Sequence, residues 1–200
     1  MCNIPWCPHL LAPLKKPVME LRSEHLLLRP VSMNFLDEIH HLHSLPETDE
    51  FNTTGIPQSV EVTKNIILEW IENQEAIPRK SYVFCSTLIE TNQFIGLIGL
   101  NIGKTNYRIA ETWFKTQPGY WKKGYTTEAL FEMLKFGFLT LGLHRIEAGC
   151  AVENTASIRL LEKAGFKREG RKKEILPIRG KWIDNYFYAI LEREFIKINN

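Results

Sequence analysis

The sequence has few cysteines, no long apolar run and almost no net charge, and each shortage argues against a class of protein. Four cysteines in 200 residues are too few for a disulfide-stapled scaffold. No run of about 18 apolar residues is present, so we expect no membrane-spanning helix. The formal net charge is +2, whereas a protein that binds a nucleic-acid backbone needs clustered excess base. We therefore expect a globular protein with no nucleic-acid and no membrane partner.

The first 19 residues lack the basic start of a secretion signal. Prolines at 5, 8, 13 and 17 would interrupt any apolar helix there. We therefore predict a proline-rich extension over 1–19, one domain over 20–196 and a tail over 197–200. A cytoplasmic location follows by default.

Metal-ligating residue types are present but poorly spaced. Cys2, Cys7 and His9 lack a fourth ligand at finger-like spacing, so an irregular tail is favoured and no metal is expected. Cys85 and Cys150 lie in apolar runs and are predicted to be buried free thiols.

Three histidines lie within four positions of one predicted helix. His40, His41 and His43 cannot all face one ion from a helix, so surface positions are favoured over a ligand role.

Hydrophobic periodicity predicts a mixed α/β fold built on a mostly antiparallel sheet. Strands are expected at 26–29, 81–89, 94–102, 107–115, 145–152, 166–176 and 181–191. Helices are expected after Ser32, around 66–71, at 125–141 and at 156–163, where Gly165 is the C′ residue. Residues 44–59 are expected to be a polar loop, and Pro177 and Gly180 to lie in the last turn.

The stretch between the predicted strand at 107–115 and the helix at 125–141 combines glycine with positive charge. Gly119 and Gly124 bracket Lys122 and Lys123 directly before the helix. Unpaired N–H groups and the helix dipole favour an anion at such a terminus, and Gly124 allows close backbone approach. An ordinary capped helix with a solvated lysine pair explains these residues equally well.

Two other phosphate-binding patterns fail. Residues 98–105 nearly spell a P-loop, but Ile98 occupies the position of the first glycine and no helix pattern follows Thr105. No G-x-G-x-x-G follows a strand either, which argues against a dinucleotide fold.

Three passages, at 121–130, 142–170 and 180–186, give the sequence a resemblance to the GNAT superfamily of N-acetyltransferases. The similarity spans about residues 21–193 and is greatest to the branch that holds ribosomal-protein N-terminal acetyltransferases. The resemblance implies a GNAT-like sheet of about seven strands and about four helices. Its splayed pair of strands would form the cleft for acetyl-CoA. The sequence departs from the family's loop pattern at Trp121, at Lys122, where glycine is common, and at Thr126, where glycine or alanine is usual.

The resemblance also implies which residues bind acetyl-CoA. Backbone N–H groups near Phe114 and Lys115 would hold the pantetheine and polarise the thioester carbonyl. Amides from Lys122 to Thr127 would bind the pyrophosphate, and Asn154 would contact the pantetheine arm. The full predicted set is Trp113, Phe114, Lys115, Trp121, Lys122, Lys123, Gly124, Tyr125, Thr126, Thr127, Asn154 and Ser157.

Two side chains are candidates for proton transfer. Glu111 is placed beside the thioester and can act as the general base, although a cross-strand salt bridge is the alternative. Ser157 lies one helical turn after Asn154, and the resemblance implies that it donates to the leaving thiolate; simple capping of the helix explains it equally well. Tyr186 and Tyr188 are weaker candidates for the acid.

The acceptor site is expected on the loop at 44–59 and the final hairpin. Glu47, Asp49 and Glu50 can attract a cationic amine there, or can be a solvated face. The leading prediction is transfer to a protein N-terminal amine of the ribosomal-protein type. A small amine such as a polyamine, aminoglycoside or amino acid is the alternative, as is a non-catalytic acyl-CoA-binding module. Homodimer formation is left open.

Overall fold

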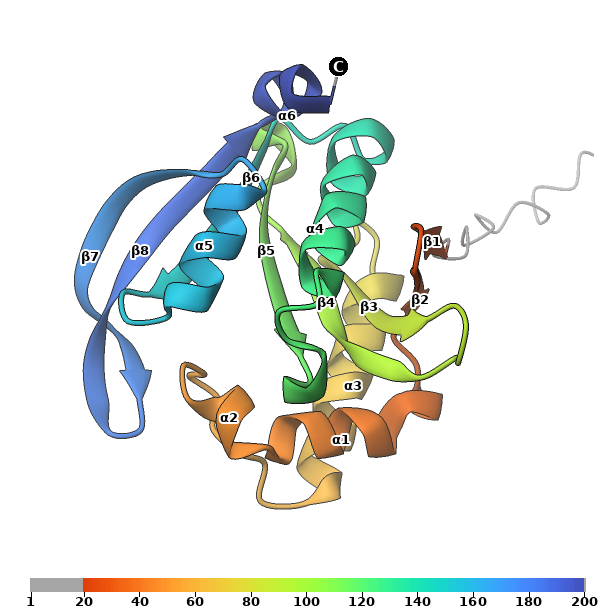
Figure 1. Ribbon diagram of the computed structural model, residues 1–200. Helices are drawn as coiled ribbons and strands as arrows, with labels where there is room; N and C mark the ends of the chain where they lie inside the picture. The colour runs from red at the N-terminus through yellow and green to blue at the C-terminus, as the bar shows by residue number, and fades with distance from the viewer. Residues whose placement is uncertain (1–19, 200) are drawn as a thin grey trace, which may run out of the picture.

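An eight-stranded sheet organises the residues that the computed structural model describes, 20–199 (Figure 1). The strands are β1 (Leu21–Arg22), β2 (Leu26–Pro30), β3 (Ser81–Leu88), β4 (Phe94–Ile102), β5 (Ile109–Thr116), β6 (Arg145–Ala151), β7 (Lys167–Ile178) and β8 (Lys181–Leu191). Their spatial order is β1-β2-β3-β4-β5-β6-β8-β7. Neighbouring strands are antiparallel except β5 and β6, which are parallel. The predicted fold class, a mixed and mostly antiparallel α/β sheet, is confirmed.

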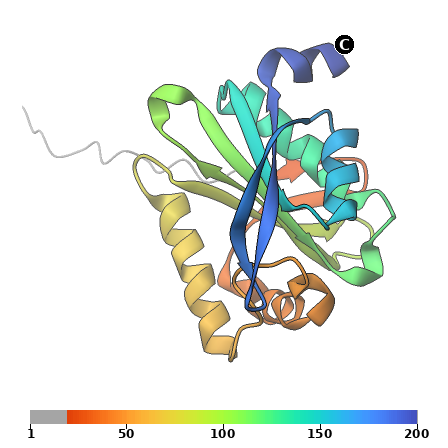
Figure 2. The same ribbon diagram turned by 90° about the vertical axis from the view of Figure 1, so that its left-hand side faces the viewer.

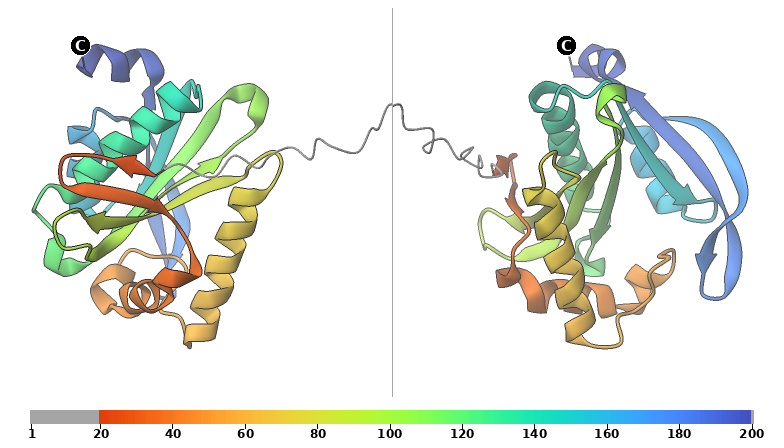
Figure 3. Two further views of the ribbon diagram at one scale, coloured as in Figure 1. Left: turned by 90° about the vertical axis from the view of Figure 1, so that its right-hand side faces the viewer. Right: turned by 180° about the vertical axis from the view of Figure 1, so that it is seen from behind.

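Helices cover both faces of this sheet (Figures 2 and 3). They are α1 (Leu36–Ser44), α2 (Pro46–Asp49), α3 (Val60–Glu75), α4 (Tyr125–Lys135), α5 (Thr155–Lys163) and α6 (Glu192–Asn199). Helices α1 and α3 pack on one face, which we call the α3 face, and α4 and α5 pack on the other, the α4 face. No helix within residues 20–199 has the length and apolarity needed to cross a membrane.

Each face has its own hydrophobic core. Leu130 and Leu134 of α4 are fully buried against the α4 face, and Ile39, Leu42 and Ile67 are fully buried against the α3 face. Burying each such side chain stabilises the fold by about 1.5–3 kcal/mol. Strands β3 and β4 lie between the two cores, which explains their continuous rather than alternating burial.

The start of β5 differs from its prediction. The strand was expected from residue 107, but Thr105–Tyr107 form a 3-10 turn and Arg108 has a φ of 51°. This left-handed residue interrupts the extended backbone, so β5 begins at Ile109. The polar loop predicted over 44–59 likewise contains a short helix, α2, which Pro46 begins in the first-turn position that suits proline.

The long helix and the last hairpin also differ from their predictions. Helix α4 ends at Lys135 and continues as a π-helical segment, Phe136–Thr140, rather than as one α-helix to 141. Strand β7 runs through Pro177, which an edge strand tolerates, and the turn consists of Arg179 and Gly180. Their φ values, 49° and 74°, suit a two-residue hairpin loop.

The predictions for the thiols and histidines have different outcomes. Cys85 and Cys150 are buried and free, as expected. His41 is exposed, but His40 is hydrogen-bonded to Thr63 at 2.8 Å and His43 is half-buried. The surface prediction is therefore wrong for His40 and His43, because the helical turn directs them toward α3.

The remaining predictions concern the two ends of the chain and the absence of a metal site. The proline-rich extension and the residues Cys2, Cys7 and His9 lie outside the described range. Within 20–199, no group of three or more His, Cys, Asp or Glu side chains is placed to hold a metal ion. At the other end, α6 continues to Asn199.

Candidate active site

Strands β5 and β6 separate partway along their length. They pair only at Ile109↔Arg145, Ala110↔Ile146 and Glu111↔Glu147. Beyond Glu111, β5 remains paired with β4, whereas β6 remains paired with β8. The divergence is visible in Figure 1, where the lower ends of the two strands lie far apart. From Thr112 onward, the edge of β5 that faces β6 therefore has no strand partner in the described sheet. Its backbone groups can bind a ligand.

Side chains of β5 alternate between the two faces of the sheet. Phe114 packs against the core on the α4 face. Trp113 packs on the α3 face, where its ring centroid lies 5.5 Å from that of Trp70. Glu111 and Lys115, two residues to either side of Trp113, share its face. The predicted base and the predicted phosphate loop thus lie on opposite sides of β5.

The loop before α4 presents an uncapped helix terminus. Gly124 is the N-cap residue with a φ of 89°, and no side chain caps the helix. The Trp121 indole Nε1 donates to the carbonyl oxygen of Thr116 at 2.7 Å, which fixes the loop to the end of β5. The amides of the first turn therefore have no side-chain acceptor. This arrangement favours an anion site over the ordinary capped helix.

The loop departs from the family pattern at Lys122 and Thr126, and the structure shows how each residue is accommodated. Lys122, at a position where glycine is common, has a φ of 60°, the left-handed conformation that glycine adopts without strain. A non-glycine residue pays about 1–2 kcal/mol for it. Thr126 turns toward β5, where its hydroxyl lies 2.8 Å from the Thr116 hydroxyl. It is therefore directed away from the space in front of the helix.

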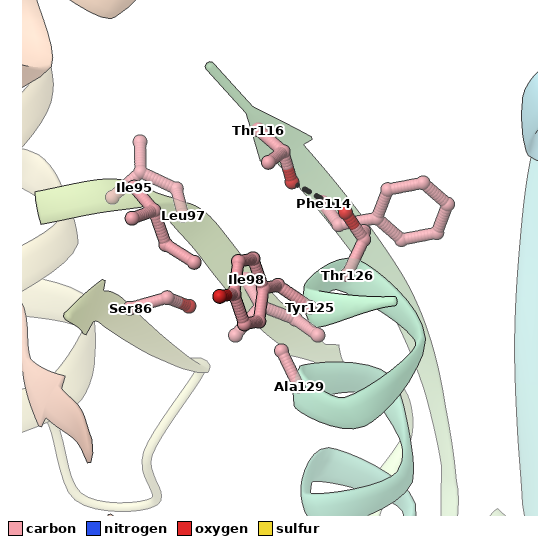
Figure 4. A pocket seen from close by; sticks show the side chains of 9 residues that line it. All are labelled: Ser86, Ile95, Leu97, Ile98, Phe114, Thr116, Tyr125, Thr126 and Ala129. Atoms are coloured by element: carbon pink, nitrogen blue, oxygen red, sulfur yellow. Dashed lines mark hydrogen bonds between the residues drawn. The ribbon is translucent and has the colours of Figure 1, made fainter. Parts of the chain in front are cut away.

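A small pocket lies beneath the first turn of α4 (Figure 4). It is lined by Ser86, Ile95, Leu97, Ile98, Phe114, Thr116, Tyr125, Thr126 and Ala129. No charged side chain lines it, and the Thr116–Thr126 hydrogen bond lies at its edge. This pocket is a gap in the packing between sheet and helix and offers no group for acyl transfer.

Glu111 lies where β5 and β6 begin to separate. It forms no ion pair with a residue in 20–199, whereas Glu147 opposite pairs with Arg145 at 2.8 Å. Arg145 also forms a bidentate pair with Glu169. Burial around the Glu111 carboxyl raises its pKa, and the charge of Glu147 adds to that shift. The cross-strand salt bridge considered for Glu111 is thus not formed, and Glu147 instead pairs with Arg145 of its own strand.

Helix α5 begins at the other side of the separation. The Asn154 Oδ1 atom accepts a hydrogen bond from the Ser157 backbone N–H at 3.0 Å, so Asn154 is the helix cap. Capping therefore does not require the Ser157 hydroxyl. Tyr188 is almost fully buried, and its hydroxyl donates to Glu162 at 3.3 Å. Burial first, then the nearby Glu162 charge, raises the pKa of Tyr188 to about 12, which disfavours it as a proton donor.

A cluster of charged groups on the α3 face was not apparent from the sequence. Asp49 of α2 contacts the Arg179 guanidinium Nε at 3.4 Å, although the two residues lie 130 positions apart. Burial lowers the pKa of Lys115 to about 8, while the Asp49 charge opposes the shift. Burial likewise lowers the pKa of His43 to about 4, helped by the Lys115 charge. Only the predicted acidic loop hinted at this cluster, because its members are separated in sequence.

Separated strands beside an uncapped, lysine-bearing helix terminus, with a carboxylate where they part, are the arrangement expected of an acetyl-CoA-dependent acetyltransferase. The profile of the family described as "Acetyltransferase (GNAT) domain" matches residues 25–167, and the chain belongs to this family. It is an N-acetyltransferase that uses acetyl-CoA as its co-substrate.

Whole-length relatives agree with this assignment. An uncharacterized N-acetyltransferase of Bacillus licheniformis is 29% identical over 88% of this chain and 97% of its own. The crystal structure of a GNAT-family acetyltransferase from Bacillus anthracis is 33% identical, with a TM-score of 0.77 over 88% of this chain and all of that one. A spermidine N-acetyltransferase from Vibrio cholerae, solved with CoA and spermine, has a TM-score of 0.78 at 24% identity over 87% and 99% of the two chains.

Two curated sequences with named acceptors match over shorter stretches. The spermidine N(1)-acetyltransferase of Vibrio cholerae is 31% identical over 51% of this chain and 59% of its own. The ribosomal protein uS5 alanine N-acetyltransferase of Escherichia coli is 37% identical over 34% of this chain and 35% of its own. The family is therefore settled, while the type of amine acceptor is not.

Proposed function

We propose that this enzyme transfers the acetyl group of acetyl-CoA to the N-terminal amine of a protein, with Glu111 as the general base. The separation of β5 from β6 directly after Glu111 carries this proposal. It brings an unpaired strand edge, which can hold the thioester, next to a carboxylate with no cation of its own. Similarity to a ribosomal-protein alanine N-acetyltransferase supports the choice of acceptor.

The pantetheine would pair with the free edge of β5 as an additional strand would. In that position, backbone N–H groups near Phe114 and Lys115 would donate to the thioester carbonyl. Negative charge develops on this oxygen as the amine attacks, so fixed donors stabilise the transition state. The pyrophosphate would bind the amides between Lys122 and Thr127, at the uncapped start of α4.

Proton transfer would involve both sides of the separation. The attacking amine must lose a proton, because an ammonium has no free electron pair. Glu111, whose pKa is raised, accepts that proton directly or through one water. The C–N bond forms and the C–S bond breaks; the nitrogen then loses its second proton to water, and the leaving thiolate, held by a hydrogen bond from the Ser157 hydroxyl, takes a proton from solvent. Asn154 would donate from its side-chain nitrogen to the pantetheine, since its oxygen is occupied by the helix cap.

The test is thiol release from acetyl-CoA in the presence of a panel of amines. The panel holds peptides with free or blocked N-termini, spermidine, an aminoglycoside and free amino acids. We expect the highest kcat/KM for a peptide with a free N-terminus, and mass spectrometry should place the acetyl group on its α-amine. Activity with small amines and with none of the peptides would contradict the proposed acceptor.

Acetyl transfer to a polyamine is the second candidate, supported by the spermidine N(1)-acetyltransferase relative. Acidic side chains at Glu47 and Glu50 can attract such a substrate, and both are exposed. The same panel separates the two functions. Spermidine carries no carbonyl group, so its acetylation reports transfer to a polyamine alone. A blocked peptide carries no free amine, so it is the negative control for transfer to a protein N-terminus.

A further inference from the structure

The part of β6 that separates from β5 carries a bare glycine on the α3 face. Ala148 and Cys150 of this strand pack into the core on the α4 face. Because side chains alternate along a strand, Glu147 and Gly149 face the opposite way, on the side where Glu111 lies. Gly149 is exposed, although β6 is an internal strand of the sheet. The backbone of β6 is therefore open to a ligand at this position.

The side-chain amide of Asn185, on β8, lies over this glycine. Register pairs Asn185 with Ala151, two residues beyond Gly149, so its side chain reaches back along β6. The Asn185 Nδ2 atom would lie 2.8 Å from a Cβ placed on Gly149. Only glycine at this position leaves room for the amide.

Neither end of this amide has a hydrogen-bond partner among residues 20–199. Asn185 is 6% exposed, and its Oδ1 atom is enclosed without a donor. The Nδ2 atom is not enclosed in this way, and it donates to no described residue. A buried amide normally makes hydrogen bonds, because unpaired polar atoms destabilise the folded state. Asn185 is therefore a donor that the protein holds in place without using it for its own fold.

Lys172 places a second donor next to Asn185. The two residues are register partners, and the Lys172 Nζ atom lies 4.1 Å from the centroid of the Phe187 ring. Lys172 forms no ion pair with a residue in 20–199. The one carboxylate of β6, Glu147, is already paired within its own strand. This part of the α3 face thus offers hydrogen-bond donors, which suit a ligand oxygen and disfavour a polycation.

Glu111 and Asn185 are separated by about the length of one amino-acid residue with its hydrogen bonds. Glu111 and Glu147 are register partners, with strands spaced about 4.8 Å apart, and Gly149 follows about 6.6 Å further along β6. The Cα atoms of Glu111 and Gly149 are therefore about 8 Å apart. The nitrogen and carbonyl oxygen of one residue lie about 3 Å apart, and a hydrogen bond at each end adds about 3 Å. An amine held at Glu111 can therefore bring its own carbonyl group to the Asn185 amide.

We propose that Asn185 recognises the carbonyl group next to the reactive amine of the acceptor. Its Nδ2 atom donates to the carbonyl oxygen above Gly149, while the amine faces Glu111. This inference rests on the proposed function and narrows it to acceptors with an α-amino carbonyl group. A peptide N-terminus and a free amino acid both carry this group, whereas a polyamine offers only donors.

A thioamide analogue tests the contact. Replacing the carbonyl oxygen of the first residue of a short peptide amide by sulfur weakens the acceptor and keeps the amine. Wild-type kcat/KM should be about three- to tenfold lower for the thioamide, as expected for one neutral hydrogen bond. Asn185→Leu removes the donor and should make the two values equal. Asn65→Leu, at an exposed site in α3, is the control and should keep the wild-type ratio. Equal values in the wild type, or an unchanged ratio in Asn185→Leu, overturn the proposal.

Thermal unfolding separates recognition from a structural role of the same side chain. An enclosed oxygen without a partner destabilises the fold, and leucine of similar size removes it. The unfolding temperature of Asn185→Leu, measured without substrates, should therefore equal or exceed that of the wild type. A lower unfolding temperature would mean that the amide serves the fold, which contradicts the proposal.

Gly149→Ala provides a second variant that leaves Asn185 in place. The new Cβ would come within 2.8 Å of the amide and displace it, so the ratio of amide to thioamide should fall toward one. Gly170→Ala, on β7, is the matched control, because a Cβ there meets nothing within 4 Å. A wild-type ratio in Gly149→Ala would contradict a contact above this glycine.

Alaninamide and its thioamide distinguish the two sources of the carbonyl group. If the enzyme acetylates alaninamide but no peptide, and discriminates against its thioamide, the Asn185 contact is retained and the proposed protein acceptor is overturned. Peptide acetylation without a thioamide effect overturns the contact alone. Acetylation of spermidine but of neither carbonyl compound overturns both.

Discussion

Glu111 and Glu147 lie opposite each other at the last position where β5 and β6 pair, and only Glu147 has an arginine partner. Two carboxylates on adjacent strands repel each other, and Arg145 relieves that repulsion for one of them. The two carboxylates therefore differ in their electrostatic surroundings, although they belong to the same residue type. The pKa of Glu111 is raised by burial and by the Glu147 charge, which is the direction in which enzymes shift a carboxylate that serves as a general base.

The pH profile of kcat/KM should therefore respond to Glu147. A base must be deprotonated to act, so the acidic limb of the profile follows the pKa of Glu111. Glu147→Gln removes a negative neighbour and leaves Arg145 nearby, and both changes favour the ionised form of Glu111. The acidic limb should shift to lower pH. Glu169→Gln, which removes the other partner of Arg145, should shift the limb less. Identical profiles for Glu147→Gln and wild type would remove Glu147 from this role.

Substitution of the base itself should separate catalysis from binding. Glu111→Gln keeps the size of the side chain and removes the proton acceptor. We expect turnover at neutral pH to fall by about 10²-fold or more, the usual contribution of a matched base. The affinity for CoA, measured by calorimetry, should change by less than about twofold, because the predicted CoA contacts are backbone groups elsewhere. Wild-type turnover in this variant would mean that another group accepts the proton.

Most of the fold followed from local sequence, because hydrophobic periodicity is a local property. Seven of the strands and the four main helices lie where apolar residues recur with period two or near four. The predicted ends of strands were wrong where the φ angle of one or two residues sets the end of the strand. Arg108 delays β5, and Arg179 with Gly180 forms a tighter turn than the proline nearby indicated. A positive φ at arginine is unfavourable locally, so only the tertiary contacts explain it.

The candidate site likewise has a part that the sequence predicted and a part that it did not. Its loop and its helix terminus are contiguous in sequence, so glycine and lysine spacing revealed them. The α3-face cluster was not predictable, because Asp49 meets Arg179 across 130 residues and Lys115 joins them from a third element. Lys115 was predicted only for its backbone N–H. Side-chain direction along β5 depends on register, which periodicity alone did not fix.

Gly124 offers a test of the phosphate loop. A Cβ there would meet nothing within 4 Å, so Gly124→Val creates no clash within the protein. The φ of 89° instead makes any side chain unfavourable, and valine, branched at Cβ, is disfavoured most. We expect weaker CoA binding, by about tenfold, because the loop must change conformation. Gly119→Val is the matched control, since its neighbourhood is equally open and its φ is not positive. Equal CoA affinity in both variants would place the pyrophosphate elsewhere.

Asn154 has two ends with different tasks, and two substitutions separate them. Its oxygen caps α5, so Asn154→Ala should destabilise the protein by about 1 kcal/mol. Aspartate caps a helix as well as asparagine does, so Asn154→Asp should retain the thermal stability. It lacks the amide nitrogen, however, and places a negative charge where the pantetheine amides would accept. CoA affinity should therefore fall in both variants, while the unfolding temperature falls only in Asn154→Ala. If Asn154→Asp binds CoA as tightly as the wild type, Asn154 serves the helix alone and the pantetheine contact is absent.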